Sequence, residues 1–521
     1  MHPFKYNAKD WLCASLITLL VLMTGAATLT AGLPYWGDDS SAYISEGIAI
    51  AEGTFQKQTE LNYIMHPFDN ISEDAGPEGL VYVWGYPLML SAVYKLAGFD
   101  RVGYTSIIWY KIPLLLGLAL SGGAMFLLFR RRFSAGVSAV CALTLCFGAN
   151  LVKHLNLLYA DLPFLFFSIL SLLLMEVYSG KALSDNSKKI RLILSALFYG
   201  AVLWFTHEVR LNGKTVCMIA AVGHLLFLLK NRRHIKQKDL WLHILPYVIM
   251  FFLTFISEHF FLAPASSNMS DVGRTTADMI KDQVLVYWKL IYGYFNGLPR
   301  FKSAYTGYIL IAACVIGMIL KGFRPENAHL TLLLLGTLAV NILLPYSQGL
   351  RYLYNILPVL IMFTAYGLQA VWRLLTSRIR LPRLFRTGVK LCAAFLILYL
   401  PLLNILKLGS YNLKHPGHIG PEDVYSAEAV DMYRYIQENV PEDMTIAFGK
   451  PRALFLNTER VSLRTGYNGH TIAEADYYLE YKTDNEQFTR EKEEAAATPK
   501  EKVYGNERFT LYRVSQMHSP Q

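Results

Sequence analysis

Residues 11–33 read WLCASLITLLVLMTGAATLTAGL and contain no charged side chain. An α-helix of this length, rising about 1.5 Å per residue, crosses the roughly 30 Å hydrocarbon core of a membrane. Lys5 and Lys9 precede the stretch. Because a cleaved signal peptide usually has a shorter apolar core, we interpret it as an uncleaved first transmembrane helix.

Further apolar runs follow the first helix along most of the chain. They lie near residues 104–129, 133–150, 160–178, 190–206, 211–229, 240–262, 303–320, 328–345, 351–372 and 388–409. The runs 190–206 and 211–229 are short, and the polar segment HEVR separates them. The pattern predicts a mainly α-helical, polytopic membrane protein with about 11 spans.

The charges between the runs agree with this count. Basic residues cluster after every second run, whereas the short loops of the other side hold one each, Lys153, Arg210 and Arg351. Cytoplasmic loops of membrane proteins carry an excess of Lys and Arg. We therefore predict a cytoplasmic N-terminus and an integral protein of the plasma (inner) membrane. Residues from about 411 onward then lie outside the cytoplasm, as do two long loops, 34–103 and 263–302.

The composition excludes several classes of protein. Of 521 residues, 53% are hydrophobic and only 17% are charged, against about 25% charged in soluble domains. The net charge of +10 is distributed in short clusters between apolar runs, so no nucleic-acid partner is predicted. The six cysteines lie in apolar runs without a CxxC pair, which argues against a metal site or a disulfide framework.

The C-terminal segment 411–521 differs from the membrane segment 1–410. It contains an amphipathic helix, SAEAVDMYRYIQENV, that Pro441 ends. Short strand candidates are TIAFG, RVSLR and DYYLEY, and VYGNERFTLYRV is typical of a hairpin with a turn at Gly505 and Asn506. The pattern predicts a small soluble α/β domain outside the cytoplasm, without a Gly-rich nucleotide-binding motif.

The outer loop 34–103 begins with an acidic pair. The stretch GLPYWGDDSSAYISEGIAIAEGTF (32–55) places Asp38 and Asp39 just outside the membrane, ahead of Tyr43 and Gly47 at helical spacing. We expect a helix on the membrane interface with both carboxylates near its N-terminus, where the helix dipole favours negative charge. The alternative is that the pair simply caps this helix, because Asp is a favoured N-cap residue.

A second segment of this loop, GPEGLVYVWGYPLMLSAVYKLAGF (76–99), is apolar and amphipathic, with Gly85 and Pro87 inside it. We interpret it as a second interfacial helix. A twelfth span is the alternative, but it would invert every later loop and violate the charge pattern.

Together these motifs resemble the GT-C superfamily of membrane glycosyltransferases. They are most similar to the branch of protein O-mannosyltransferases, lipid A aminoarabinose transferases and their bacterial relatives. Further similar segments, in the expected order, are LLYADLPFLFFSILSLLL (157–174), WFTHEVRLNGKTVCMIA (204–220), QGLRYLYNILPVLIMFTAYGL (348–368) and KPRALFLNTERVSLR (450–464). The resemblance covers almost the whole chain and implies the GT-C fold, but it does not specify the substrate.

The resemblance implies transfer of a sugar from a polyprenyl-phosphate carrier to an acceptor outside the cytoplasm, with inversion. The acceptor hydroxyl needs a nearby general base, for which Asp38 or Asp39 is the candidate. The family pair is usually Asp-Glu rather than Asp-Asp. Counting from Gly53 favours Asp38 and counting from Tyr43 favours Asp39, so both are retained.

The leaving phosphate needs a cation, because it gains negative charge. Arg351 matches the Arg-Tyr segment of the family and opens a span on the outer side, and Arg210 is the second candidate. The alternative for each is a snorkelling side chain or a structural ion pair.

Further polar residues on the outer side are candidates for orienting the acceptor: Tyr43, Asp161, His154 and Glu208. Asp161 matches the second acidic position of the family and would pair with Arg351 or Arg210, or cap the span that follows it. His and carboxylate side chains can bind a divalent metal. Their spacing here is not diagnostic, and we predict neither a metal nor another cofactor besides the lipid-linked donor. The aromatic residues of loop 263–302, Tyr287, Trp288, Tyr292, Tyr294 and Phe295, are interpreted as an interfacial belt or as sugar-stacking groups.

The sequence therefore predicts a polyprenyl-phosphate-sugar-dependent glycosyltransferase with a glycan, lipid or protein acceptor, surrounded by membrane lipids. One alternative is a glycolipid transporter or flippase, although the paired broken helices of many transporters are missing. The other is a non-catalytic membrane scaffold whose outer domain binds a partner.

Overall fold

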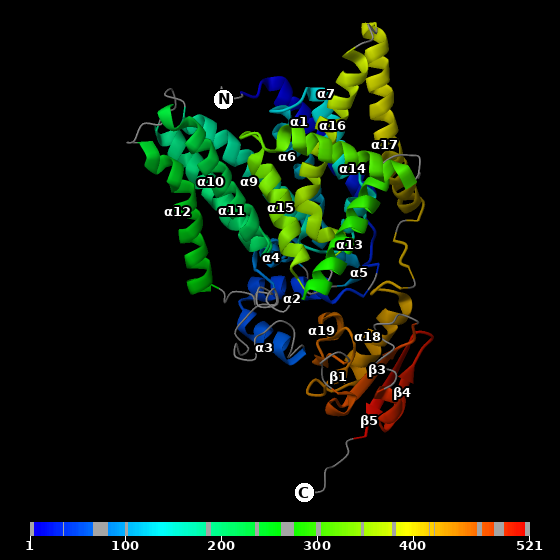
Figure 1. Cartoon of the computed structure of the whole chain (residues 1–521). Coiled ribbons are helices and arrows are strands. Elements are labelled where there is room, and N and C mark those ends of the chain that lie inside the picture. Colours follow the sequence, from blue (N-terminus) through cyan, green and yellow to red (C-terminus); the bar gives the residue numbers. More distant parts are fainter. Residues whose placement is uncertain are drawn as a thin grey trace.

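The computed structural model describes residues 5–34, 36–65, 82–98, 103–183, 189–234, 239–261, 276–297, 304–344, 349–377, 382–415, 417–420, 422–465, 471–483 and 494–515. Long helices form a bundle, and a small domain with a β-sheet lies at one end of it, opposite the end that holds the N-terminus (Figure 1). The short helix α2 lies between the bundle and this domain, and α3 lies beside the domain. The predicted fold class, polytopic helices with a small C-terminal α/β domain, is confirmed.

Each predicted apolar run lies on a helix of the bundle. These helices are α1 (Ala8–Ala27), α6 (Ile112–Arg130), α7 (Ala135–Cys146), α9 (Asp161–Ala182), α10 (Lys189–Val209), α11 (Gly213–Asn231), α12 (Leu240–Ile256), α14 (Ala304–Gly317), α15 (Ala328–Ile342), α16 (Leu357–Ser377) and α17 (Arg383–Lys414). Shorter helical elements are α5 (Tyr104–Ile107), η1 (Trp109–Lys111), α8 (Ala149–His154), η2 (Arg232–His234), η4 (Ser257–Phe261), η6 (Met318–Gly322) and η7 (Leu350–Ile356).

Fewer of these helices than predicted are long enough to cross a membrane alone. In the part of the chain that the structure describes, eight segments pass by length and apolarity, and a ninth passes if the two arms of α17, bent by 41°, count as one span. The other two predicted spans coincide with α7 and α15, which have 12 and 15 residues. The apolar runs at these two places extend past the helix ends. Hydropathy alone does not indicate where a helix ends, so the sequence predicted longer spans. Eight such helices make the chain an integral membrane protein.

Close helix packing brings α16 against α14. A Cβ atom on Gly317 would overlap the carbonyl of Phe363, and one on Gly367 would overlap the carbonyl of Ala313. Small residues allow two membrane helices to approach this closely. The contact fixes α16, whose preceding turn η7 carries Arg351.

The segment 263–302, predicted as an outer loop, contains a long helix, which corrects the prediction. Residues 262–275 and 298–303 lie outside the described residues, but between them α13 (Ala277–Asn296) is a helix of 20 residues. Tyr287, Tyr294 and Phe295 are buried in the core, whereas Trp288 is 44% exposed. Amphipathic spacing turns these three aromatic side chains inward, so they do not form an interfacial belt.

The segment 34–103, predicted as an outer loop, contains three helices, α2 (Asp38–Glu52), α3 (Phe55–Met65) and α4 (Gly85–Ala97). The helices expected after the acidic pair and around Pro87 are present, and α3 is an addition. Residues 66–81, including the beginning of the segment 76–99, lie outside the described residues. Gly47 of α2 lies against α4, because a Cβ there would come 2.9 Å from the carbonyl oxygen of Pro87.

The C-terminal domain confirms the predicted α/β pattern. Its helical elements are α18 (Ala427–Asn439), α19 (Pro451–Thr458) and η8 (Ile472–Glu474). Its strands are β1 (Ile446–Ala447), β2 (Ser462–Leu463), β3 (Tyr477–Tyr481), β4 (Lys500–Gly505) and β5 (Phe509–Val514). The sheet order is β2-β1-β3-β5-β4. The first three strands are parallel, and β3, β5 and β4 are antiparallel, so β4 and β5 form the expected hairpin.

The segment after α1 anchors the C-terminal domain to the bundle. Trp36 is 6% exposed, and its ring centroid lies 5.6–6.2 Å from those of Tyr433, Phe448, Tyr481 and Phe509. An aromatic residue from the membrane segment thus completes the core of the C-terminal domain. The apolar area that it buries favours a fixed position of this domain beside the acidic pair.

A buried lysine fixes the same segment from the membrane side. The Nζ of Lys111, a fully buried residue, donates to the carbonyl oxygens of Thr30 (2.8 Å) and Gly32 (2.7 Å) and to Oδ1 of Asn156 (3.1 Å). A buried ammonium group is costly unless hydrogen bonds satisfy it. Lys111 therefore joins the exit of α1 to the segments before α6 and α9.

We expect Gly32→Ala to weaken the junction between the bundle and the C-terminal domain. A Cβ at Gly32 would overlap the carboxyl group of Asp423, which accepts hydrogen bonds from the backbone N–H groups of Leu33 (3.1 Å) and Tyr425 (2.9 Å). Overpacking of this kind costs about 1–3 kcal/mol, so the thermal midpoint in detergent should fall.

The matched control is Gly136→Ala in α7, where a Cβ meets nothing within 4 Å. Alanine is the better helix former, so the control should be neutral or slightly stabilising. Equal midpoints for the two variants would contradict the packing role of Gly32.

Candidate active site

Asp38 and Asp39 are the first two residues of α2, but neither caps it. The N-cap is Gly37, which supplies no side-chain hydrogen bond. The alternative that the pair caps its own helix is therefore wrong. Both carboxylates still lie at the N-terminus of the helix, where its dipole stabilises negative charge.

Asp38 binds the C-terminal domain. Its Oδ1 accepts hydrogen bonds from the backbone N–H groups of Arg452 (3.1 Å) and Ala453 (3.4 Å), in the first turn of α19. Oδ2 lies 3.9 Å from Nη1 of Arg452, and the Asp38 side chain is 12% exposed. The first N–H groups of a helix have no partner within the helix. Asp38 supplies a hydrogen-bond acceptor to these N–H groups across the domain boundary. These hydrogen bonds occupy Oδ1 of its carboxylate.

Asp39 faces the other way, toward η7 at the start of α16. Its Oδ2 lies 3.2 Å from Nη2 of Arg351, and its side chain is 36% exposed. The Tyr82 hydroxyl also hydrogen-bonds to Asp39. Of the two carboxylates, Asp39 is the more accessible, and it lies beside the predicted phosphate-binding arginine.

Arg351 and Arg210 share an aromatic neighbour. Their guanidinium carbons lie 5.2 Å and 4.1 Å from the ring centroid of Tyr352, and Arg351 also stacks 4.5 Å from Tyr159. Such cation–π contacts fix the plane of each guanidinium group. Two cations beside one ring repel each other unless anions lie between or beside them.

Each of these arginines has a carboxylate partner. Arg351 pairs with Asp39, and Nη1 of Arg210 pairs with Asp161. Asp161 is the first residue of α9, and Ala160 is the N-cap, so Asp161 forms the predicted ion pair and not the cap. Among the described residues, each guanidinium group uses one nitrogen for these hydrogen bonds and has further N–H donors available.

Tyrosines form one wall of the site. Tyr43 of α2 stacks on Tyr82, with ring centroids 4.1 Å apart, and makes an edge contact with Tyr86 at 4.9 Å. Burial raises the pKa of Tyr43 and of Tyr82 well above the usual value of a phenol. Both hydroxyls therefore stay protonated, and Tyr82 donates its proton in the hydrogen bond to Asp39.

His154 of α8 contacts η7 through the hydroxyl of Tyr354. Its Nδ1 lies 2.8 Å from the carbonyl oxygen of Asn150 and 2.7 Å from the hydroxyl of Tyr354, three residues after Arg351. Burial, and then the nearby positive charges of Arg351, Lys153 and Arg210, lower the pKa of His154 to about 4. The ring is neutral at physiological pH, which indicates a bracing role.

This lowered pKa predicts a pH dependence of stability. The unfolded chain binds a proton at this histidine below about pH 6.5, and the folded protein does so only near pH 4. The contribution of His154 to stability is thus complete above pH 6.5 and is lost as the pH falls toward 4. We expect His154→Gln to flatten the decline of the thermal midpoint over this range.

The pH dependence of the thermal midpoint must be compared between the variant and the wild type, because a second group titrates in the same range. Burial raises the pKa of Asp423 to about 6, so Asp423 contributes in the opposite direction, with stability lost as the pH rises from about 4 to 6. The exposed His415, changed to Gln, is the control and should leave the pH profile as it is in the wild type. An unchanged slope in His154→Gln would show that this ring does not titrate as inferred.

The hydrogen-bond partners of Glu208 lie on α10 and at the end of α12. Glu208 is buried, and its Oε1 lies 3.0 Å from the Ser257 hydroxyl and 3.2 Å from Nδ1 of His207. It thus joins α10 to the end of α12. Among the described residues, no group of three or more His, Cys, Asp or Glu side chains could hold a metal ion.

Sequence reasoning missed the aromatic part of the site. Tyr82, Tyr159 and Tyr352 surround the charged groups, yet tyrosines are frequent at any membrane interface, so no pattern distinguished them. Leu158, next to Tyr159, has φ 49°, a left-handed conformation that is uncommon for leucine. The carbonyl of Leu157 accepts a hydrogen bond of 2.6 Å from Ser40 of α2, so the strained turn is held against the acidic helix.

Comparison with known proteins supports the fold at low sequence identity. No family model matches the sequence, nor does any curated protein sequence. The chain resembles the crystal structure of ArnT from Cupriavidus metallidurans bound to undecaprenyl phosphate, with a TM-score of 0.55 and 13% identity over 99% of this chain and 100% of that one.

It also resembles the archaeal oligosaccharyltransferase AglB from Archaeoglobus fulgidus, in complex with an inhibitory peptide and a dolichol-phosphate. That match has a TM-score of 0.56 and 12% identity over 97% of this chain and 75% of the other. The chain therefore has the fold of these two structures, which is the GT-C fold that the sequence motifs predicted.

Proposed function

We propose that the protein is a glycosyltransferase that moves a sugar from a polyprenyl-phosphate-linked donor to a glycan, lipid or protein acceptor. One observation carries the proposal. An accessible carboxylate, Asp39, lies 3.2 Å from Arg351, in a site where two arginines retain free N–H donors among the described residues. The GT-C fold supports it, since the similar structures of ArnT and AglB were determined with polyprenyl-type phosphates.

In this proposal, Asp39 is the general base. It takes the proton of the acceptor hydroxyl while the oxygen attacks the anomeric carbon of the donor sugar. The bond from that carbon to the phosphate oxygen breaks, and the polyprenyl phosphate leaves with the electron pair. A single displacement inverts the anomeric centre. Asp38 is the weaker candidate because its Oδ1 already binds two backbone N–H groups.

Arg351 and Arg210 stabilise the phosphate in this scheme. The charge on the leaving oxygen grows during the reaction, and fixed cations beside it are most effective in the transition state. Tyr159 and Tyr352 keep the guanidinium groups in place before the donor arrives, so little reorganisation is needed. Because this pair supplies the cationic charge, we propose that the reaction requires no cofactor beyond the lipid-linked donor.

An apolar cavity of ≈ 540 Å³ between α2, α4, α10 and α12 suits the polyprenyl chain. Its lining includes Ile50 of α2, Trp84 and Leu88 near α4, Trp204 of α10 and Leu253 of α12. Trp204 precedes Arg210 by six residues, which is roughly 9 Å along a helix. A lipid with its phosphate at the arginines could thus place its first isoprene units in the cavity.

The topology is part of the proposal. The active site, with the domain 411–521 beside it, would lie on the extracytoplasmic side of a plasma (inner) membrane, and the catalytic domain would be 1–410. The charge distribution along the sequence supports this orientation. The contact of Asp38 with α19 supports a role of the C-terminal domain in ordering the site, and acceptor recognition there is our proposal.

The test is donor turnover by the purified protein in detergent. A panel of polyprenyl-phosphate sugars is offered with a membrane extract as acceptor, and release of free polyprenyl phosphate is measured. Release from one donor by the wild type, but not by Asp39→Asn, would support the proposal, and the productive sugar would identify the donor. A folded wild type that releases none from any donor, yet moves a glycolipid across vesicle membranes, would favour a transporter.

A further inference from the structure

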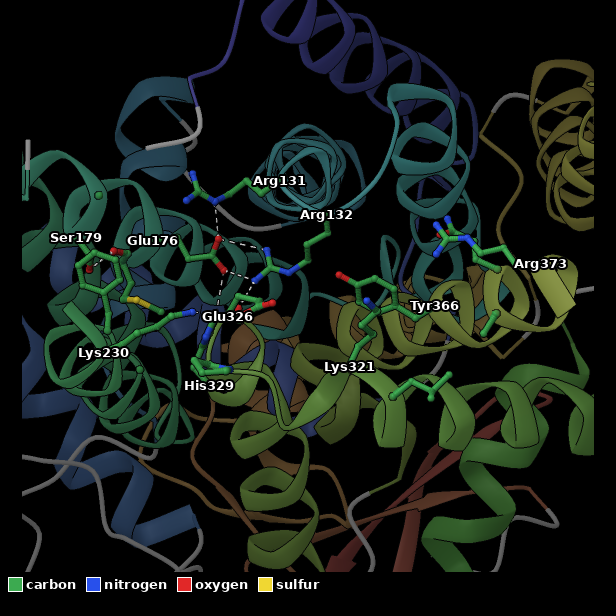
Figure 2. A pocket seen from close by; sticks show the side chains of 18 residues that line it. Arg131, Arg132, Glu176, Ser179, Lys230, Lys321, Glu326, His329, Tyr366 and Arg373 are labelled. Carbon is green, nitrogen blue, oxygen red and sulfur yellow. Dashed lines mark hydrogen bonds and ion pairs between the residues drawn. The ribbon is translucent and has the colours of Figure 1, made fainter. Parts of the chain in front are cut away.

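A second cavity, which is polar, lies at the other end of the bundle. Its volume is ≈ 550 Å³, and its lining comes from the segment after α6 and from α9, α11, η6, α15 and α16 (Figure 2). The helix α16 has Arg351 just before its first turn and Arg373 near its end. Leu357 and Arg373 are 16 residues apart, or roughly 24 Å along the helix. This cavity is therefore distinct from the candidate active site.

Its floor is a compact group of charges. Oε2 of Glu176 lies 2.7 Å from Nε of Arg131, and Oε1 lies 2.5 Å from Nη2 of Arg132 and 3.0 Å from Nε2 of His329. Arg132 is 5% exposed. Figure 2 shows the three side chains meeting at Glu176. One carboxylate thus serves three basic groups, which leaves the floor positive.

The rim adds more positive charge than it neutralises. Lys230 and Glu326 face each other at 3.6 Å, and both are partly exposed. Lys321 of η6 and Arg373 of α16 also line the cavity, and neither makes an ion pair with any described residue. In all, five lysines and arginines face two glutamates in the lining, so these seven side chains carry a net charge of +3.

Positive charge at this end also follows from membrane topology, so charge alone does not indicate a ligand. The arrangement of these charges around one cavity is the additional observation. Topology requires basic residues near helix ends, but it does not require them to surround one concavity large enough for a ligand. Arg132, moreover, is buried by contacts with Asn327 (Nε to Oδ1, 2.8 Å) and the carbonyl oxygen of Glu326 (2.9 Å), which fix its guanidinium plane.

We propose that this cavity binds a phosphate group. Arginines fixed in position and lysines at the rim are the side chains that recognise phosphate. The phosphate would come from the headgroup of an anionic membrane lipid or from a soluble phosphate compound. Bound there, it would connect α6, α11 and α16 and stabilise the bundle at the end away from the active site.

The experiment compares two double variants of the full-length protein in detergent. Lys321→Gln/Arg373→Gln removes two rim charges. Lys189→Gln/Arg191→Gln removes two exposed charges from the beginning of α10 that do not line the cavity. Binding of phosphatidylglycerol is measured by native mass spectrometry and by the shift of the thermal midpoint. Phosphatidylcholine, and chloride at matched ionic strength, are the reference additions.

We expect the rim variant to bind phosphatidylglycerol about 10-fold or more weakly, since one charge-assisted hydrogen bond is worth roughly a factor of ten. The Lys189/Arg191 variant should bind like the wild type. Competition by inorganic phosphate would identify a soluble phosphate as the source, and its failure would identify a lipid headgroup. Equal binding by both variants, or a wild type that neither binds the lipid nor is stabilised by phosphate above chloride, would overturn the proposal. The two wild-type measurements, lipid binding and stabilisation by phosphate, test the proposal even if the rim variant does not fold.

Discussion

Asp39→Asn is expected to lower kcat for sugar transfer by about 10²–10⁴-fold, the usual contribution of a general base. Asparagine keeps the size of the side chain but cannot take the acceptor proton. The fold should be retained, because the ion pair with Arg351 is partly exposed and such pairs contribute only about 0–1 kcal/mol. The measurement is release of polyprenyl phosphate, with the thermal midpoint recorded on the same sample.

Asp38→Asn is the matched control one position earlier. It removes the negative charge at the first turn of α19 but keeps an accepting oxygen, and should cost about 0.3–2 kcal/mol of stability. We expect its kcat to fall much less than that of Asp39→Asn, since the carboxylate of Asp38 is turned toward the C-terminal domain. The reverse order, with activity retained in Asp39→Asn and lost in Asp38→Asn, would transfer the role of base to Asp38.

Arg351→Ala should reduce kcat/KM by about 10²–10³-fold, as the loss of one group that stabilises transition-state charge typically does. Arg351→Lys retains the charge but loses the planar fork and the stacking on Tyr159 and Tyr352, so we expect an intermediate value. Steady-state kinetics on a defined donor, with the thermal midpoint as a check on folding, would measure both. Wild-type kinetics in Arg351→Ala would exclude this residue from the phosphate site.

Arg210 is a less suitable position for this experiment. Its partner Asp161 is 2% exposed, and removing one member of a buried ion pair typically costs about 3–5 kcal/mol because the other charge stays buried. Arg210→Ala is therefore expected to lower stability as well as activity. The difference in midpoint between Arg210→Ala and Arg351→Ala separates the structural part of the effect from the catalytic part.

Much of the fold could be predicted from the sequence because lipid requires long apolar runs, which hydropathy detects directly. The C-terminal domain was also predictable, since the helix at 427–439 and the strands around it show period-specific patterns. The helix α13 was not, because its charged and aromatic residues suggest a loop at the interface. Nothing local indicated that Trp36 would enter the core of a domain almost 400 residues later in the chain.

Among the site residues, the sequence supplied the chemical types but not their partners. It identified Asp38, Asp39, Arg210 and Arg351 as charges on one side of the bundle. The number of membrane crossings that precede a residue, odd or even, decides on which side that residue lies. Which acid faces which cation depends on helix rotation and on contacts between segments more than 300 residues apart. Those contacts turn Asp38 toward α19 and Asp39 toward Arg351. Neighbouring residues on a helix point about 100° apart, so only the packed structure could assign the two acids different partners.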